Sequence, residues 1–193
     1  LEYRTILVID ESFMDFVLAK EDFSMLSNIK NTQYLIILNS LTKFYALPGL
    51  RLGCCITNKK LINKLVSLKD PWNINCFAQL AGIKSIQDKD FQIKTKNYIA
   101  KEKDDLFSQI NAIPIFQAYY PSVNFILIKV MDSNLNSTKL TTLLAKKGIL
   151  VRNCNTFSGL KENYIRVAVR TKEDNNKLIK ALMEIYESGG KSD

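Results

Sequence analysis

The fold is decided by residues 35–56, which read LIILNSLTKFYALPGLRLGCCI. The apolar run 35–38 is typical of a buried strand, because it is too short for a globular helix. A polar loop with a Pro-Gly pair follows, and residues 52–56 form a second apolar run. The pattern therefore predicts two buried strands joined by a loop that carries Lys43 and Arg51.

The chemical character of this loop comes from four side chains. A lysine held against apolar surroundings is kept neutral more easily, because desolvation disfavours the ammonium. A neutral amine is what Schiff-base chemistry requires. Arg51 always carries charge, and Ser40 and Thr42 add hydroxyl groups beside Lys43. Such a loop could bind a phosphorylated aldehyde; the alternative is a surface loop with two of the 27 basic residues of the chain.

The residues 40–53, SLTKFYALPGLRLG, resemble the lysine loop of fold-type I pyridoxal-phosphate (PLP) enzymes. The matching branch contains threonine-phosphate decarboxylases and histidinol-phosphate aminotransferases. The resemblance implies that Lys43 is catalytic and binds PLP covalently. It also implies that Ser40 and Arg51 hold the cofactor phosphate, with Thr42 beside them.

An acidic residue ends the first apolar segment. Residues 5–9, TILVI, are typical of a buried strand, and Asp10 follows at the end where parallel α/β sheets bind ligands. A turn or helix-capping role for Asp10 is the alternative. Residues 8–16 resemble the strand whose carboxylate keeps the PLP ring nitrogen protonated, so that the ring accepts electrons. By this resemblance, Asp10 is that carboxylate and a second catalytic residue.

Phe13 is a further predicted cofactor contact, three residues after Asp10. Many members of the family have a tyrosine at this position, and its hydroxyl binds the phenolic oxygen of the cofactor. Phenylalanine has no hydroxyl. The decarboxylases often have phenylalanine here, so Phe13 favours a decarboxylase over an aminotransferase.

The chain is expected to be an α/β protein with two parts of the fold-type I architecture. Residues 1–112 resemble the C-terminal part of the large PLP-binding domain, with a mostly parallel sheet and helices. Residues 113–188 are expected to form a small α+β domain, followed by a tail at 189–193. Family members carry an upstream glycine-rich cofactor segment that is not among the 193 residues, so exposed strand edges are expected in the first part.

Two strands and a helix cap of the second part bear on the substrate. Strands are expected at 149–152 and 164–170, and Thr171 is suited to cap a following helix. Alternation in the second strand predicts one shared face for Tyr164, Arg166, Ala168 and Arg170.

Arg152 and Arg166 are the candidate substrate ligands. Each lies in a mostly apolar strand pattern, where a guanidinium must find an acceptor. An internal salt bridge is one interpretation, and a substrate carboxylate or phosphate held bidentately is the other. Residues 148–171 resemble the C-terminal domain of threonine-phosphate decarboxylase. This implies that Arg166 binds the substrate α-carboxylate and Arg152 the substrate phosphate, with Asn124 near the substrate.

The resemblance implies PLP-dependent decarboxylation of L-threonine O-3-phosphate to aminopropanol phosphate in cobalamin biosynthesis. An aminotransferase acting on histidinol phosphate or a related amino acid is the alternative within the family. A non-catalytic, ligand-sensing domain of a transcription regulator is an alternative of another class. A homodimer is expected for the full-length protein. Residues 70–75, DPWNIN, resemble a segment near the subunit contact; burial of Trp72 in the core is the other interpretation.

Bulk composition limits the remaining function classes. The chain is 47% hydrophobic, which supports a packed core. It has no histidine, and its four cysteines lack metal-ligand spacing, so no metal site is expected. Cys54 and Cys55 are expected as reduced core residues of a cytoplasmic protein. The net charge of +8 comes from scattered lysines, so neither nucleic acid nor a membrane is expected as a partner.

Overall fold

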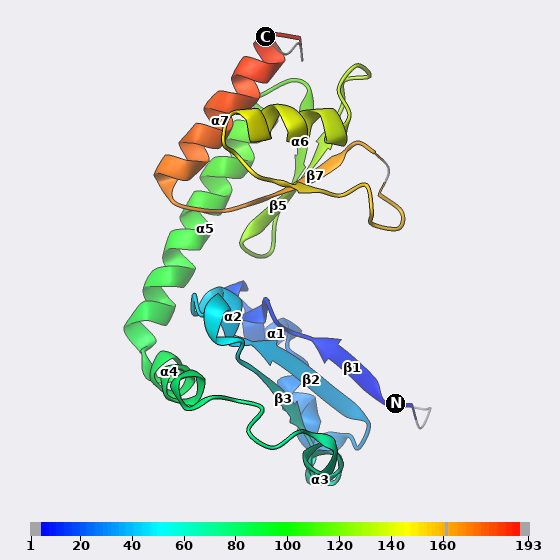
Figure 1. Cartoon of the computed structure of the whole chain (residues 1–193), viewed down its shortest axis with the longest axis vertical. Coiled ribbons are helices and arrows are strands. Elements are labelled where there is room, and N and C mark those ends of the chain that lie inside the picture. The colour runs from blue at the N-terminus through cyan, green and yellow to red at the C-terminus, as the bar shows by residue number, and fades with distance from the viewer. Residues whose placement is uncertain (1–4, 161, 190–193) are drawn as a thin grey trace. The chain divides into compact units, whose positions relative to one another are not determined.

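The structure, a computed structural model, describes residues 5–160 and 162–189. It divides into two compact units, unit 1 (Leu1–Lys96) and unit 2 (Asn97–Asp193), and each has its own sheet (Figure 1). Helix α5 (Lys89–Asn111) contributes residues to both units. The predicted division after residue 112 stays a prediction.

Unit 1 contains a three-stranded sheet with the strand order β1-β2-β3. The strands are β1 (Leu7–Asp10), β2 (Leu35–Ser40) and β3 (Gly53–Thr57). β1 runs parallel to β2, and β3 runs antiparallel to β2. Strands are thereby confirmed at both predicted positions of the deciding stretch. The predicted burial of the second strand is wrong, because Gly53 and Cys54 of β3 are exposed.

The unit 1 sheet has one covered face and one open face. Alternate side chains of a strand point to opposite faces. Leu35 and Ile37 are each 1% exposed, whereas Leu38 is 39% exposed on the other face. The open face forms an apolar groove of about 810 Å³ beside α3 (Lys59–Leu68). The predicted burial of the first strand is wrong, because β1 is an edge strand and Val8 lines this groove.

Short helices connect and flank the strands of unit 1. Two asparagines cap the N-termini of the longer helices. Asn58 accepts a backbone N–H of the first turn of α3 at 3.1 Å, and Asn75 does the same for the helix that begins at Cys76, at 2.8 Å. Gly82 allows α4 (Cys76–Gln87) to approach Leu52 closely, because a Cβ at this position would collide with Leu52 Cδ2. The other helical segments are α1 (Lys20–Phe23), α2 (Leu41–Phe44), α4 (Cys76–Gln87) and the 3-10 turns η1 (Met14–Phe16), η2 (Met25–Asn31) and η3 (Pro48–Leu50).

Unit 2 is built on a four-stranded antiparallel sheet with the order β4-β5-β7-β6. The strands are β4 (Phe116–Tyr119), β5 (Phe125–Val130), β6 (Arg152–Asn153) and β7 (Tyr164–Ala168). Helices α6 (Ser137–Lys146) and α7 (Lys172–Glu187) and the second part of α5 bury one face, where Leu106, Ile126 and Leu182 are fully buried (Figure 1). The opposite face carries Phe125, Leu127 and Lys129 of β5 and Tyr164 and Arg166 of β7.

The predictions for unit 2 have mixed outcomes. The strand expected at 149–152 is present only as β6, because only Arg152 and Asn153 pair with β7. β4 has no counterpart among the predictions. The predicted cap is confirmed, since Thr171 Oγ1 accepts the N–H of Asp174 at 3.2 Å where α7 begins.

Candidate active site

The predicted cofactor residues of unit 1 lie at one edge of its sheet. Asp10 is the last residue of β1 and Ser40 the last of β2, and these parallel strands place Asp10 opposite Leu38. Helix α2, which contains Lys43, begins directly after Ser40. The carboxylate and the lysine turn therefore share the carboxyl edge of two neighbouring strands, where parallel sheets bind ligands.

Two hydroxyl groups are held together at the start of α2. Ser40 Oγ lies 2.8 Å from Thr42 Oγ1 and accepts the N–H of Thr42 at 3.3 Å. Thr42 is buried and Ser40 is half-buried. The pair is ordered by its own contacts, so it loses little side-chain freedom when an anion binds.

Lys43 differs from expectation in its surroundings. The expected loop contains one turn of helix, α2, in which Leu41, Thr42 and Phe44 are buried and Lys43 is exposed. Residues of one helical turn point in different directions, so three of them fill the core and Lys43 faces outward. The prediction of apolar surroundings for Lys43 is wrong among the described residues, and its amine is accessible to a ligand.

Arg51 lies at the same edge of the sheet. It comes two residues before Gly53, which pairs with Ser40. Its φ of 54° and ψ of 48° fall in the left-handed region, which is uncommon for a residue other than glycine. The Nη1 group donates to the carbonyl of Pro48 at 3.2 Å, and the side chain is exposed. The guanidinium thus remains open to an anion.

Asp10 is exposed, and Ser12 hydrogen-bonds its carboxylate. The N–H of Ser12 donates to Asp10 Oδ1 at 2.9 Å. Hydrogen bonds from the side chain and the backbone of Ser12 lower the pKa of Asp10 from its ordinary value, and desolvation opposes this only in part. The carboxylate is therefore charged at neutral pH, as the partner of a cationic ring nitrogen must be.

A series of aromatic rings connects the Asp10 segment with the lysine turn. The ring centroid of Phe13 lies 6.4 Å from that of Phe16, which lies 5.1 Å from that of Phe44. Phe16 and Phe44 are buried, at 7% and 2% exposure. This packing stabilises α2 against the turn that follows β1.

In unit 2, Arg152 and Arg166 are direct partners across β6 and β7. The guanidinium of Arg166 lies over the ring of Phe125 at 4.5 Å, and that of Arg152 lies over Phe157 at 5.4 Å. The ion pairs among the described residues involve neither arginine, which removes the internal salt-bridge interpretation for this part of the chain. Like charges directly opposite each other destabilise a sheet, so the pair is suited to an anion.

Asn124 has an unusual carbonyl oxygen. Its Oδ1 atom is buried and has no hydrogen-bond partner among the described residues, whereas its main-chain carbonyl accepts the N–H of Val169 at 2.9 Å. A buried acceptor without a donor costs free energy, so such groups call for an explanation such as a bound ligand or ion. Asn124 directly precedes β5, at the end of the strand that carries Phe125.

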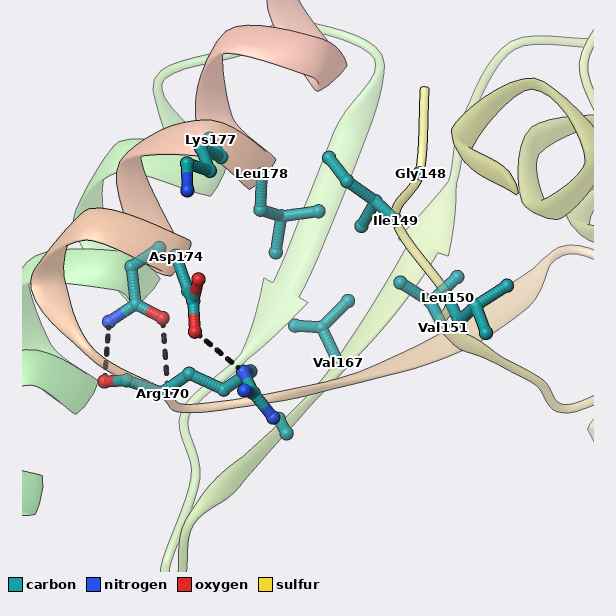
Figure 2. Close-up of a pocket in the computed structure, with 11 residues that line it drawn as sticks. Gly148, Ile149, Leu150, Val151, Val167, Arg170, Asp174, Lys177 and Leu178 are labelled. Atoms are coloured by element: carbon teal, nitrogen blue, oxygen red, sulfur yellow. Dashed lines mark hydrogen bonds and ion pairs between the residues drawn. The ribbon is translucent and has the colours of Figure 1, made fainter. Parts of the chain in front are cut away.

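The predicted shared face of β7 does not extend to Arg170. β7 ends at Ala168, and Arg170 Nε donates to Asp174 Oδ2 in α7 at 2.9 Å. Figure 2 shows this pair beside a cavity that has both polar and apolar lining residues. The volume of this cavity is about 460 Å³. Arg170 therefore stabilises the first turn of α7 and lies outside the Arg152–Arg166 pair.

Four neighbours of the predicted site residues were not found from sequence: Ser12, Phe125, Phe157 and Thr156, whose Oγ1 accepts a hydrogen bond from Arg152 Nη2 at 3.1 Å. Ser12 has a local signal, because a serine two residues after an aspartate is placed to hydrogen-bond it. The two phenylalanines have none, since their stacking depends on how β5, β7 and the segment after β6 meet in space.

Other expectations concern the cysteines and Trp72. Cys54 is exposed and Cys55 is partly exposed, so their expected burial in the core is wrong. Trp72 is 94% exposed, which excludes the core interpretation. Within residues 5–160 and 162–189, no group of three or more His, Cys, Asp or Glu could hold a metal ion, and no helix is long and apolar enough to cross a membrane.

A carboxylate and a lysine turn at one sheet edge of an α/β unit agree with the class that the lysine loop resembles, the fold-type I proteins. The chain belongs to the aminotransferase class I and II family, whose model matches residues 1–182. The chain is 38% identical to the adenosylcobalamin biosynthesis bifunctional protein CobDQ of Leptospira interrogans, over 95% of this chain and 21% of the relative. It is 31% identical to threonine-phosphate decarboxylase of Salmonella typhimurium, over 93% of this chain and 48% of the relative.

A solved structure confirms the predicted architecture. The crystal structure of histidinol-phosphate aminotransferase from Clostridium acetobutylicum is 33% identical and superposes with a TM-score of 0.91, over 97% of this chain and 56% of that chain. The fold-type I α/β architecture is therefore correct. The chain spans about half the length of the curated relatives it matches, or less.

Proposed function

We propose that this chain is the catalytic part of a PLP-dependent enzyme, with Lys43 as the residue that binds the cofactor. The observation that carries the proposal is the shared sheet edge of Asp10 and the Lys43 turn in a chain of this family. We expect the 193 residues alone to bind PLP weakly and to have little activity, because members of the family also use upstream residues.

The donor set of unit 1 fits PLP group by group. The exposed amine of Lys43 suits an aldehyde, and the charged carboxylate of Asp10 suits a protonated ring nitrogen. The paired hydroxyls of Ser40 and Thr42, with the guanidinium of Arg51, suit a phosphate. Phe13 offers an aromatic edge without a hydroxyl. When bound, PLP supplies an acceptor for the electrons left on the amino-acid α-carbon as one of its bonds breaks.

We assign the substrate to the phosphorylated amino acids, and specifically to L-threonine O-3-phosphate. Arg166 binds the α-carboxylate of the substrate and Arg152 binds its phosphate. Each guanidinium lies over a phenylalanine ring, and neither has a carboxylate partner among the described ion pairs. Asn124 Oδ1 accepts a donor from the bound molecule. Loss of carbon dioxide gives aminopropanol phosphate, and the amine of Lys43 can return a proton to the α-carbon. We therefore propose a role in cobalamin biosynthesis, and we expect the full-length protein to be a cytoplasmic homodimer.

A second candidate is an aminotransferase acting on histidinol phosphate or a related amino acid. It is favoured by the match to the aminotransferase of Clostridium acetobutylicum, with its TM-score of 0.91. The two reactions differ in their needs: transamination requires an oxo-acid acceptor, whereas decarboxylation releases carbon dioxide and requires none. Product analysis with and without 2-oxoglutarate therefore separates them.

The test of PLP binding is reductive trapping. The chain is incubated with PLP, reduced with borohydride and digested, and the modified lysine is found by mass spectrometry. The proposal expects preferential modification of Lys43, loss of this label in Lys43→Ala, and an unchanged label in Lys60→Ala, an exposed lysine of α3. Equal labelling of all exposed lysines would contradict it.

A further inference from the structure

We propose that Thr156 is a positioning residue that orients the guanidinium of Arg152 for the substrate phosphate. The inference rests on the proposed function, in which Arg152 binds that phosphate. It adds a neutral hydroxyl group that acts through Arg152 and need not touch the substrate.

Two contacts of different kinds hold the guanidinium of Arg152. Its Nη2 group donates a hydrogen bond to Thr156 Oγ1 at 3.1 Å, and its Cζ atom lies 5.4 Å from the centroid of the Phe157 ring. Arg152 is exposed, and an exposed arginine without such contacts samples many rotamers, whose restriction costs free energy when a ligand binds. The hydroxyl and the ring lower this cost, because they set the direction of the guanidinium in advance.

The turn that carries Thr156 and Phe157 is fixed to the sheet of unit 2. The N–H of Phe157 donates to the carbonyl of Cys154 at 3.0 Å, which closes a turn that contains Thr156. Cys154 is only 1% exposed, and its own N–H donates to the carbonyl of Tyr164 in β7 at 3.0 Å. The neighbouring strand therefore sets the position of Thr156.

Asn153 fastens the start of the same turn to α6. Its Oδ1 atom accepts the N–H of Asn155 at 3.0 Å and the hydroxyl of Ser137 at 2.9 Å. Its Nδ2 group donates to Thr138 Oγ1 at 3.0 Å. A side-chain amide with three hydrogen bonds is costly to move. The support beneath Thr156 is thus ordered before any ligand binds.

The partner of Arg152 is neutral, which distinguishes this residue from Arg170. Arg170 Nε donates to the carboxylate of Asp174 at 2.9 Å, so a negative charge compensates that guanidinium. A hydroxyl group and an aromatic ring orient a guanidinium and leave its charge uncompensated. A phosphate monoester carries a charge of about −1.5 to −2 at neutral pH, so it gains from both the fixed direction and the full charge of Arg152.

The test uses the full chain without cofactor, with inorganic phosphate as the probe. Nitrogen-15 NMR follows the guanidinium of Arg152, which Arg152→Lys assigns. It gives the rate of rotation about the Nε–Cζ bond and the Kd for phosphate at this guanidinium. The inference expects Thr156→Val to speed the rotation and to weaken phosphate binding about two- to tenfold, as the loss of one hydrogen bond implies. Thr156→Ser, which keeps the hydroxyl, should restore both values.

Two further variants separate direction from charge. Thr156→Asp keeps an acceptor for Arg152 and adds a negative charge, so rotation should stay slow while phosphate binding weakens. Thr142→Val, at an exposed threonine of α6, is the matched control and leaves both quantities unchanged. If Thr156→Val does not fold, Thr156→Ala gives the same comparison.

An unchanged rotation rate or an unchanged Kd in Thr156→Val would overturn the inference. If phosphate shifts the Arg152 resonance of the unmodified chain, that result overturns the role of Thr156 alone. If phosphate does not shift this resonance, the proposed phosphate site at Arg152 is overturned, and the inference with it. Failure of reductive trapping on Lys43 overturns PLP binding alone, because neither Thr156 nor Arg152 takes part in it.

Discussion

The pairing of Arg152 with Arg166 leads to a quantitative prediction for the chain without ligand. Like charges directly opposite each other across a sheet cost about 0.2–1 kcal/mol. Each guanidinium also gains about 0.5–1 kcal/mol from the ring beneath it, as for an exposed cation–π contact. A single change of either arginine to glutamine relieves the repulsion and loses one ring contact. Arg152→Gln also loses the hydrogen bond from Arg152 Nη2 to Thr156 Oγ1 at 3.1 Å. Each single variant should therefore be close to the unmodified chain in its free energy of unfolding.

The double variant reveals the repulsion. Once Arg152→Gln has removed one charge, Arg166→Gln loses a ring contact and relieves nothing. The double variant should be less stable than the sum of the single effects by the repulsion itself, about 0.2–1 kcal/mol. Urea unfolding followed by circular dichroism measures all four proteins. The deviation of the double variant from the sum of the single effects should shrink in 1 M salt, where the Debye length falls to about 3 Å.

A matched cycle on Arg170 and Asp174 provides the control. These residues form an ion pair at 2.9 Å one turn apart, so the coupling between Arg170→Gln and Asp174→Asn should have the opposite sign, at about 0.3–0.5 kcal/mol. Inorganic phosphate at about 100 times its Kd should stabilise the unmodified chain by about 2.7 kcal/mol. It should stabilise the double arginine variant less, because that variant keeps only the Ser40, Thr42 and Arg51 groups of unit 1. Zero or attractive coupling between Arg152 and Arg166 at low salt would refute the reasoning.

Three further predictions concern single side chains. Gly82→Ala should destabilise unit 1 by up to about 2 kcal/mol in urea unfolding, because the added Cβ would collide with Leu52 Cδ2, at a cost of about 1–3 kcal/mol, while alanine gains about 1 kcal/mol in a helix. A more stable variant would contradict the close approach of α4. Asn124→Leu should raise the thermal midpoint by removing the unpaired Oδ1 atom, whose burial costs about 1–3 kcal/mol; a lower midpoint would mean that the oxygen has a donor. Hydrogen bonding to Arg170 lowers the pKa of Asp174. The charged Asp174 therefore stabilises the folded chain fully above about pH 4, and this contribution is lost as the pH falls. Asp174→Asn should make the free energy of unfolding less sensitive to acid, and an identical acid dependence of the two proteins would contradict this prediction.

Local sequence patterns predicted the parts of the fold that depend on neighbouring residues. The apolar runs of β2 and β3 gave two strands of the correct type. Thr171 was a correct cap because its hydroxyl meets an N–H only three residues away. Asp10 and Lys43 were correctly expected near strand ends, since an abrupt change from apolar to polar residues marks where a buried strand stops.

The remaining features depend on contacts that are distant in sequence. β6 contains only two residues, because its length is set by its pairing with β7. Lys43 faces outward because the other three residues of α2 fill the core, and one turn has no periodicity from which to predict this. Cys54 and Trp72 are apolar enough for a core, but composition does not reveal which surfaces of a sheet are covered. The stacking of Phe157 on Arg152 likewise has no local signal.

The central claim is that Lys43 and Asp10 serve one PLP molecule from a single sheet edge. A crystal structure of the borohydride-reduced PLP adduct tests it most directly. The account predicts density that joins the cofactor to Lys43, with the ring nitrogen within hydrogen-bonding distance of the Asp10 carboxylate and the phosphate against Ser40 and Arg51. An adduct on another lysine, or a ring nitrogen that faces away from Asp10, would contradict it.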